Sequence, residues 1–359
     1  MPFVPVLLLL VLAVCAAGTA IFVRLSRRQG ILDVPNERSM HAEPVPVGAG
    51  LVISATVLAA LLVYFLMGSA GFNGSFARFA AYFIASAVLV AVSWLDDLSH
   101  VPAWVRFGIH ALAALAILWF SPVWEMESGF RQWSFAGAVF IWMVGFTNAF
   151  NFMDGSDGIA GSQAVATGLG WGVLGAVLGS EAVSFAGFAI AAACAAFLYF
   201  NWEPAKVFMG DSGSAFLGFS FAAFPIFVIA DLDPLAPGSA DRWLIVLYAV
   251  ALTWPFVFDS SVTFFRRLLK GERVWEPHRK HLYQAMVMRG MPHSAVAALY
   301  GLSGIVCSAA VIVSAVLETL FPVVAAVAFV SLALPFAAHL SGGITKRRKV
   351  GEISELERN

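Results

Sequence analysis

Runs of about twenty apolar residues, separated by short polar segments, fill most of the 359-residue chain. A helix needs roughly 20 apolar residues to cross about 30 Å of hydrocarbon, so each run has the length of a membrane span. Charged residues make up 12% of the chain, about half of the share in soluble proteins. We therefore expect an all-α integral membrane protein with about eleven transmembrane helices (ten or eleven), at 3–24, 48–67, 77–95, 103–120, 132–150, 159–179, 182–201, 213–230, 242–264, 294–317 and 319–341.

Lysine and arginine are distributed unevenly between the two sides that these spans define. If the N-terminus lies outside, Arg78, Arg131 and Arg242 fall on the outer side and the other eighteen of the 21 Lys and Arg residues on the inner side. Short cytoplasmic loops carry an excess of such residues. This predicts an outside N-terminus and a cytoplasmic C-terminus, with one membrane domain over 1–341 and a polar cytoplasmic tail over 342–359. The net charge of the chain is −1, so it has no overall positive potential that would attract nucleic acid.

Four polar clusters, at 94–98, 148–158, 208–214 and 278–284, interrupt the apolar runs. The predicted topology puts all four on the cytoplasmic side. Three are acidic and one is basic, and carboxylates that converge at a membrane surface suggest a divalent cation and phosphate chemistry. In the first cluster, Asp96 and Asp97 repel each other unless a cation or proton lies between them. A solvated helix end is the alternative for this pair.

The second and third clusters carry the other acidic candidates. In 148–158, amide and carboxylate side chains recur every three residues, which places neighbours on one helix face before a glycine-rich turn. They suit a nucleotide, a sugar or a metal-bound phosphate, and they are Asn148, Asn151, Asp154 and Asp157. Asp211 lies between glycines and is a candidate Mg²⁺ ligand, with Ser212 and Ser214 expected to cap the next helix. The string Gly-Asp-Ser-Gly also occurs in trypsin-like proteases, which we reject because nothing suggests their soluble β-barrel.

The basic cluster and two residues inside spans complete the candidates. Attraction to lipid headgroups explains the Lys and Arg of 278–284, but less well His278 and His281, which could help to stabilise charge on a transferring phosphorus. His110 and Asp259 fall within spans, and an ionisable residue there is a functional hypothesis by default. The alternatives are a helix-packing hydrogen bond for His110, and for Asp259 a pair with Arg266 or a neighbouring helix.

In order and content, these clusters resemble the polyprenyl-phosphate N-acetylhexosamine-1-phosphate transferase family, of glycosyltransferase family 4 type. The similarity runs from Asp33 to Gly290 and includes a looser form of the motif Asp-Pro-Asn-x-Arg-Ser-x-His over 33–41. The form His-x-x-His-Leu-Tyr-Gln at 278–284 is more similar to the O-antigen initiator branch than to the phospho-N-acetylmuramoyl-pentapeptide transferase branch. Relatives commonly have Pro-Arg-Gly-Gly-Gly where this chain has Pro-Val-Gly-Ala-Gly at 46–50, so the arginine of that motif is absent.

The resemblance implies transfer of an N-acetylhexosamine 1-phosphate from a UDP-sugar to undecaprenyl phosphate, with release of UMP, as the membrane step that initiates O-antigen or cell-wall polysaccharide synthesis. It implies Mg²⁺, with Mn²⁺ as the alternative, and a cytoplasmic active site in a bacterial inner membrane. A homodimer would fit the family. The donor sugar stays open among N-acetylglucosamine, N-acetylfucosamine and N-acetylquinovosamine.

The resemblance also implies roles for the candidates. Asp96, Asp97 and His281 would be catalytic, with one acid of the pair keeping the lipid phosphate deprotonated, and Asp211 and Asp154 would bind metal. A route through an aspartyl-phosphate stays open. The residues expected to bind substrate are Asn148, Asn151, Asp154, Asp157, His278, Arg279, Asn36, Arg38 and His41.

Two other classes of protein fit parts of the pattern. A cation-coupled transporter would place facing acids near the bilayer midplane, whereas these acids fall at span ends on one side. Another membrane phosphatase or lipid-phosphate enzyme would release inorganic phosphate and would not require uridine.

Overall fold

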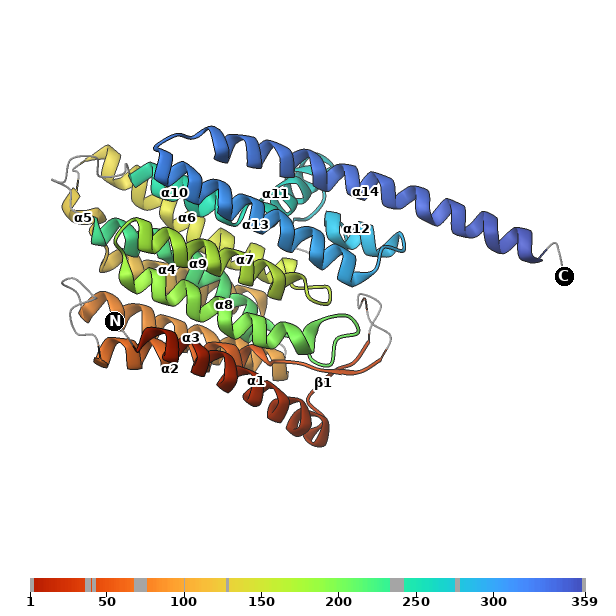
Figure 1. Cartoon of the computed structure of the whole chain (residues 1–359), viewed down its shortest axis with the longest axis horizontal. Coiled ribbons are helices and arrows are strands. Elements are labelled where there is room, and N and C mark those ends of the chain that lie inside the picture. The colour runs from red at the N-terminus through yellow and green to blue at the C-terminus, as the bar shows by residue number, and fades with distance from the viewer. Residues whose placement is uncertain are drawn as a thin grey trace.

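The computed structural model describes residues 3–35, 40, 43–67, 76–99, 101–126, 129–232, 242–274 and 278–356, and only the backbone at 125–126 and 343–356. Apart from loops, the described residues contain one short antiparallel pair, β1 (Leu32–Asp33) with β2 (Val45–Pro46). All other elements are helices (Figure 1), which confirms the predicted all-α membrane class. They are α1 (Val4–Gln29), α2 (Gly50–Met67), α3 (Phe76–Ser99), α4 (Ala103–Trp119), α5 (Val123–Met126), α6 (Phe130–Met153), α7 (Ile159–Val177), α8 (Glu181–Asn201), α9 (Asp211–Asp231), α10 (Arg242–Leu252), α11 (Trp254–Leu269), α12 (Leu282–Met288), α13 (His293–Leu317) and α14 (Phe321–Leu356).

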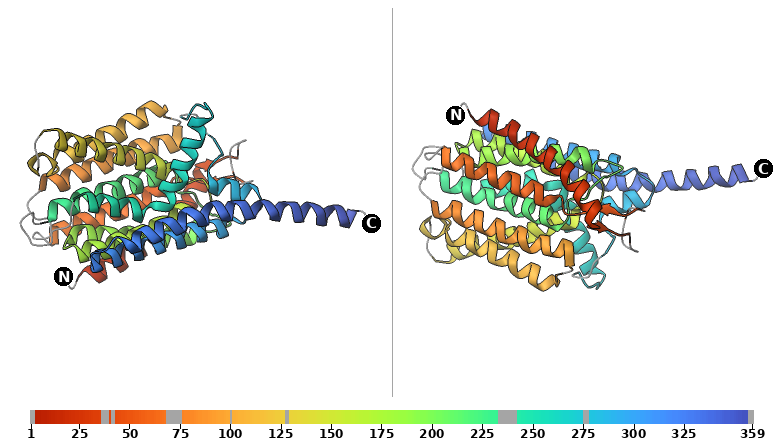
Figure 2. Two further views of the ribbon diagram at one scale, coloured as in Figure 1. Left: turned by 90° about the horizontal axis from the view of Figure 1, so that it is seen from above. Right: turned by 90° about the horizontal axis from the view of Figure 1, so that it is seen from below.

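Each predicted span coincides with a helix or with the pair α10 and α11. Among the described residues, eight helices are long and apolar enough to cross a membrane, or nine if the bent pair is one span. Helix α4 has 17 residues and is only about 26 Å long, and α7 is not among the eight. The number eleven therefore stays a prediction. The two chain ends lie at opposite ends of the bundle (Figure 2), as an odd number of crossings would require.

Helix α9 forms the centre of the bundle. Of the apolar window of α9, 89% of the residues are buried, against 17% for α1 and 28% for α14. Helix α9 packs against α2, α3 and α6, whereas α1 and α14 present large exposed side chains such as Leu9 and Phe329. Exposed apolar surface of this extent is rare on soluble monomers, so these outer faces fit a hydrocarbon environment.

The glycines of α7 allow it to pack closely on α8. A Cβ on Gly168 would lie 2.8 Å from the carbonyl oxygen of Gly187, and a Cβ on Gly175 would lie 2.6 Å from the amide nitrogen of Ser184. Small residues let membrane helices approach in this way. The glycine-rich composition of 159–179 thus serves helix packing.

The span predicted at 242–264 is not one helix. Helices α10 and α11 meet at 82°. Thr253 separates them, and its Oγ1 donates to the carbonyl oxygens of Ala249 and Val250. Pro255 has no N–H to continue the helical hydrogen bonds. As a result α11 runs across one end of the bundle (Figure 2), where Asp259 meets the start of α12.

Candidate active site

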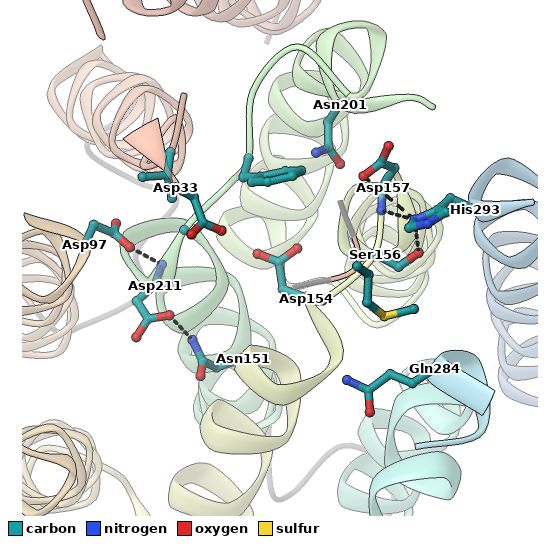
Figure 3. A pocket seen from close by; sticks show the side chains of 15 residues that line it. Asp33, Asp97, Asn151, Asp154, Ser156, Asp157, Asn201, Asp211, Gln284 and His293 are labelled. Carbon is teal, nitrogen blue, oxygen red and sulfur yellow. Dashed lines mark hydrogen bonds and ion pairs between the residues drawn. The ribbon is translucent and has the colours of Figure 1, made fainter. Parts of the chain in front are cut away.

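The polar clusters meet at the end of the bundle that holds β1 and α12 (Figure 1). A cavity of about 330 Å³ there, the acidic cavity, is lined by the carboxylates of Asp33, Asp97, Asp154, Asp157 and Asp211. Figure 3 shows the carboxylates of Asp33 and Asp154 pointing into this cavity. Its other polar lining consists of Asn151, Ser156, Asn201, Gln284 and His293.

Asp97, near the end of α3, caps the N-terminus of α9. Its carboxylate accepts hydrogen bonds from the backbone N–H of Asp211 at 2.7 Å, and from the N–H and Oγ of Ser212 at 3.2 Å and 2.8 Å. The unpaired N–H groups and positive dipole at a helix start favour a carboxylate. The expectation that Ser212 and Ser214 cap α9 is wrong, because the cap comes from another helix.

The loop before α9 brings Asp211 next to this cap. Gly210 has φ 75°, and a Cβ there would lie 2.6 Å from Oδ1 of Asp97, so the loop needs glycine at this position. The N–H of Gly50 donates to the carbonyl oxygen of Met209 at 2.8 Å, and the N–H of Phe208 donates to that of Pro46 at 2.8 Å. Segment 46–50 therefore supports the Asp211 loop through its backbone.

Arg106 on α4 joins two of the predicted acids. Its Nη1 lies 2.6 Å from Oδ2 of Asp96 and 2.6 Å from Oδ2 of Asp211. Asn151 donates to the other oxygen of Asp211 at 2.8 Å. Asp96 and Asp97 thus face different partners, and a guanidinium and a helix terminus relieve the repulsion inferred from their adjacency.

The repeat of 148–158 is helical only in its first half. Helix α6 ends at Met153, so Asn148 and Asn151 share the helix and Asp154 and Asp157 lie beyond it. Asp157 accepts a hydrogen bond from the N–H of Ala205 at 3.0 Å, and this bond connects the turn after α6 to the loop after α8. Asp154 accepts no hydrogen bond from the described residues. Burial, followed by the charges of Asp211 and Asp97, raises the pKa of Asp154 well above its usual range.

A second cavity of about 360 Å³, the histidine cavity, adjoins the acidic cavity, since Asn151 and Asp211 line both. Most of its other polar lining is basic or neutral, namely Ser93, Arg106, His110, Asn148, His278 and His281. Burial, followed by the electrostatic effect of the neighbouring His281, Arg267 and Lys280, lowers the pKa of His278 to about 4. His278 is therefore a neutral imidazole at pH 7.

Asp259 on α11 holds His281 in place. The fully buried carboxylate accepts hydrogen bonds from Nδ1 of His281 at 3.2 Å, from the N–H groups of Leu282 and Tyr283 at 2.8 Å and 3.1 Å, and from the hydroxyls of Tyr300 and Thr263 at 2.6 Å and 3.2 Å. A carboxylate only accepts, so Nδ1 carries the proton and Nε2 is left for the cavity. Of the partners considered from sequence, Asp259 binds neighbouring segments rather than Arg266.

A third, largely apolar cavity of about 470 Å³ continues from the histidine cavity between α6 and α11, and the two share Phe152, Val274, His278 and His281. Ile141 and Phe265, which line it, are exposed at 72% and 59%. The apolar cavity therefore opens onto the outer, lipid-facing surface of the bundle.

The predicted site residues are divided among these places. Asn151, Asp154, Asp157, Asp211 and Asp97 line the acidic cavity, and Asn148, His278 and His281 line the histidine cavity. Asp96 binds Arg106, Arg279 lines none of the three cavities, and Asn36, Arg38 and His41 lie outside the described residues.

Sequence reasoning did not select several residues that line the cavities. In the sequence Arg106 stands out only as an inner charge, although its spacing of four from His110 places both on one helix face. Asp33 stands out only as the start of a motif. Asn201, Gln284 and His293 come from three separate helices, or the ends of helices, and no sequence spacing connects them.

Comparisons with known proteins agree with this arrangement. Residues 79–229 match the family model described as glycosyl transferase family 4. The probable undecaprenyl-phosphate N-acetylglucosaminyl 1-phosphate transferase of Bacillus subtilis is 27% identical over 82% of this chain and 80% of its own. The undecaprenyl-phosphate alpha-N-acetylglucosaminyl 1-phosphate transferase of Yersinia pestis is 27% identical over 73% and 70%. The phospho-N-acetylmuramoyl-pentapeptide-transferase of Listeria welshimeri is 28% identical over 70% and 79%.

Relatives of both branches are thus similar to most of the chain. The polar clusters, the multi-pass helical fold and these matches lead to one conclusion. Over most of its length the chain is similar to undecaprenyl-phosphate N-acetylglucosaminyl 1-phosphate transferases, and residues 79–229 match glycosyl transferase family 4.

Proposed function

We propose that this protein transfers an N-acetylhexosamine 1-phosphate from a UDP-sugar to undecaprenyl phosphate and releases UMP. The observation that carries the proposal is the series of three adjoining cavities, acidic, then histidine-lined, then apolar. This order suits a cation-bound diphosphate, a lipid phosphate and a hydrocarbon chain. The names of relatives in Bacillus subtilis and Yersinia pestis contain the same acceptor and an N-acetylglucosaminyl 1-phosphate group.

The acidic cavity requires a cation before it can accept a diphosphate. Five carboxylates line it, and Asp154 faces the negative charges of Asp211 and Asp97. Among the described residues, no group of three or more His, Cys, Asp or Glu side chains is arranged to hold a metal alone. Mg²⁺ commonly uses one or two carboxylates together with substrate phosphates, so Asp154 and Asp211 fit as its ligands. When bound, the ion would neutralise the diphosphate and the leaving UMP.

The acceptor would enter from the lipid side. Its isoprenoid chain fits the apolar cavity, and its phosphate would then lie in the histidine cavity beside Arg106 and His281. A phosphate monoester has a second pKa of about 6, so at pH 7 its oxygen can attack without a carboxylate base. We propose that Asp96 acts by orienting Arg106 and that Asp97 acts by orienting α9, in place of the base expected from sequence.

The reaction follows from these positions. An oxygen of the lipid phosphate forms a bond to the β-phosphorus, and the bond from that phosphorus to the bridging oxygen breaks, with its electron pair leaving on UMP. When Nε2 also carries a proton, His281, oriented by Asp259, would donate a hydrogen bond from Nε2 to the developing charge. An aspartyl-phosphate intermediate at Asp97 or Asp211 would need a free carboxylate oxygen, and both oxygens of each are engaged. Asp154, which accepts no hydrogen bond from the described residues, is assigned to the cation, so direct transfer is favoured.

The distribution of charge along the chain bears on the membrane orientation of the site and on the alternative of a transporter. The inner loops carry most of the Lys and Arg, so we propose that the cavities open at the cytoplasmic face of a bacterial inner membrane. A transporter would need facing acids near the midplane, whereas these carboxylates line a cavity at the end of the bundle where β1 and α12 lie (Figure 1).

The test is UMP release by purified protein given undecaprenyl phosphate, Mg²⁺ and a panel of UDP-N-acetylhexosamines. We expect UMP from at least one sugar, only when both lipid and Mg²⁺ are present. Asp211→Asn should abolish the release. Asp231→Asn is the matched control, because Asp231 is the last residue of the same helix and accepts a hydrogen bond from Ser180 at the far end. Release of inorganic phosphate without UMP would favour the phosphatase, and no UMP from any sugar would reject the proposal.

A further inference from the structure

Three of the seven histidines of the chain line the histidine cavity, and one reaches it from a distant part of the fold. His278 and His281 precede α12, whereas His110 lies on α4, four residues after Arg106. Residues four apart lie on one face of a helix. Helix α4 therefore contributes a guanidinium and an imidazole to the same cavity.

The His110 ring is incompletely paired. The side chain is buried, at 6% exposure, and Nδ1 has no hydrogen-bond partner among the described residues. The ring also contacts Asn148, which lines the same cavity and donates its own Nδ2 to the carbonyl oxygen of Val144. A buried polar atom without a partner is unfavourable, and in native proteins a catalytic role or a bound water or ion is among the explanations.

A phosphate suits this position better than other ligands. It offers P–O⁻ acceptors and, when singly protonated, a P–OH donor, so it can pair with an imidazole nitrogen in either tautomer. Asp211 is the one carboxylate among the described residues lining this cavity, and Arg106 already pairs with it. Repulsion of an incoming anion is therefore weak here compared with the acidic cavity.

The shape of the site assigns this phosphate to the acceptor. The histidine cavity shares Phe152 and Val274 with the apolar cavity, so an anion bound beside His110 can carry a hydrocarbon chain. We propose that His110 contacts the phosphate of the polyprenyl acceptor, together with Arg106, and makes the site prefer lipid phosphate over the free lipid alcohol. This inference rests on the proposed function, because it names the residue that recognises the acceptor.

The experiment compares the binding of undecaprenyl phosphate and undecaprenol to the detergent-purified full chain by native mass spectrometry. We expect wild-type protein to prefer the phosphate. His110→Leu keeps most of the side-chain volume, and it should weaken phosphate binding about tenfold and leave alcohol binding unchanged. His110→Gln retains hydrogen-bonding groups and should recover part of the preference. In turnover, the KM for undecaprenyl phosphate should rise in His110→Leu by the same factor, while the KM for the UDP-sugar stays within about twofold.

Ser314→Ala is the matched control. Ser314 is a buried side chain of α13 whose Oγ also lacks a partner among the described residues, and it lines none of the three cavities. Its binding should equal that of wild type. Melting temperature and gel-filtration profile show whether each variant is folded, and His110→Ala replaces His110→Leu if the larger apolar group does not fit.

The outcomes separate this inference from the proposed function. If the variant lacking the imidazole binds lipid phosphate as wild type does, His110 is a helix-packing residue and the inference falls, while UMP release is untouched. If wild-type protein does not distinguish phosphate from alcohol, the inference falls as well. If wild type prefers phosphate through His110 but no UDP-sugar yields UMP, the acceptor site stands and the proposed donor reaction falls.

Discussion

Replacing Asp259 by Asn tests whether this buried carboxylate determines the working state of His281. Its Oδ1 accepts from Nδ1 of His281, the N–H of Leu282 and the hydroxyl of Thr263, and its Oδ2 accepts from the N–H of Tyr283 and the hydroxyl of Tyr300. Asparagine has nearly the same shape. However, one of its two terminal groups is an NH₂ that only donates.

The size of the effect follows from the donors that lose an acceptor. If the amide oxygen takes the place of Oδ1, the N–H of Tyr283 loses its acceptor and the Tyr300 hydroxyl must turn to accept. If it takes the place of Oδ2, His281 and Leu282 lose theirs. Each buried unpaired donor costs about 1–3 kcal/mol, and the side chain adopts the orientation that leaves one donor unpaired, so we expect a loss of about 1–3 kcal/mol in unfolding free energy. Without the charge of the carboxylate, the doubly protonated ring, which donates from both nitrogens, is no longer stabilised. The matching change in serine proteases lowers kcat by about 10⁴, so we expect kcat to fall by about 10²–10⁴.

The assay is lipid-dependent UMP release, together with the thermal unfolding midpoint in detergent. Tyr300→Phe is the matched control, because it removes one donor from Oδ2 and leaves the bond between Oδ1 and His281 intact. It should lower stability by about 1 kcal/mol and keep kcat within about threefold. Equal losses of kcat in the two variants, or unchanged kcat in Asp259→Asn, would refute the idea that Asp259 acts through His281.

Three further predictions test other parts of the site. Mg²⁺ should raise the unfolding midpoint of wild type and of Asp231→Asn but not of Asp154→Asn, and an equal rise in Asp154→Asn would remove Asp154 from the cation site. The pKa of His278 is lowered from 6.5 to about 4, so between these values the unfolded chain takes up a proton that the folded chain refuses, and wild type should lose stability relative to His278→Gln as the pH falls below about 6.5. Unfolding midpoints between pH 4 and 8 check this, with His339→Gln, on the exposed surface of α14, as the control; a constant difference would contradict it. Gly210→Ala should abolish UMP release, because its Cβ would lie 2.6 Å from Oδ1 of Asp97 at φ 75°, whereas Gly108→Ala, with nothing within 4 Å of the added carbon, should behave as wild type; an active Gly210→Ala enzyme would show that the Asp97 cap is dispensable.

The sequence alone determined the membrane class and the positions of the helices. Apolar runs of this length leave a helix as the way to pair the backbone in hydrocarbon, and the predicted spans coincide with the observed helices because that requirement is local. The sequence also predicted that the four polar clusters lie on the same side, because the order of spans along the chain decides on which side each loop emerges. The break between α10 and α11 at Thr253 and Pro255 was not predicted, because the residues on both sides of it are apolar.

The partners of the polar side chains were decided only by the tertiary structure. Asp97 caps a helix whose first residue lies 114 positions away, Asp259 holds His281 from a separate helix, and His110 faces a cavity that it shares with the loop before α12. In a membrane bundle nearly every helix face is apolar, so periodicity does not reveal which face meets which neighbour. Those contacts come from close packing around α9. That packing decides which carboxylates line the acidic cavity and which, like Asp259, hydrogen-bond to neighbouring segments of the protein.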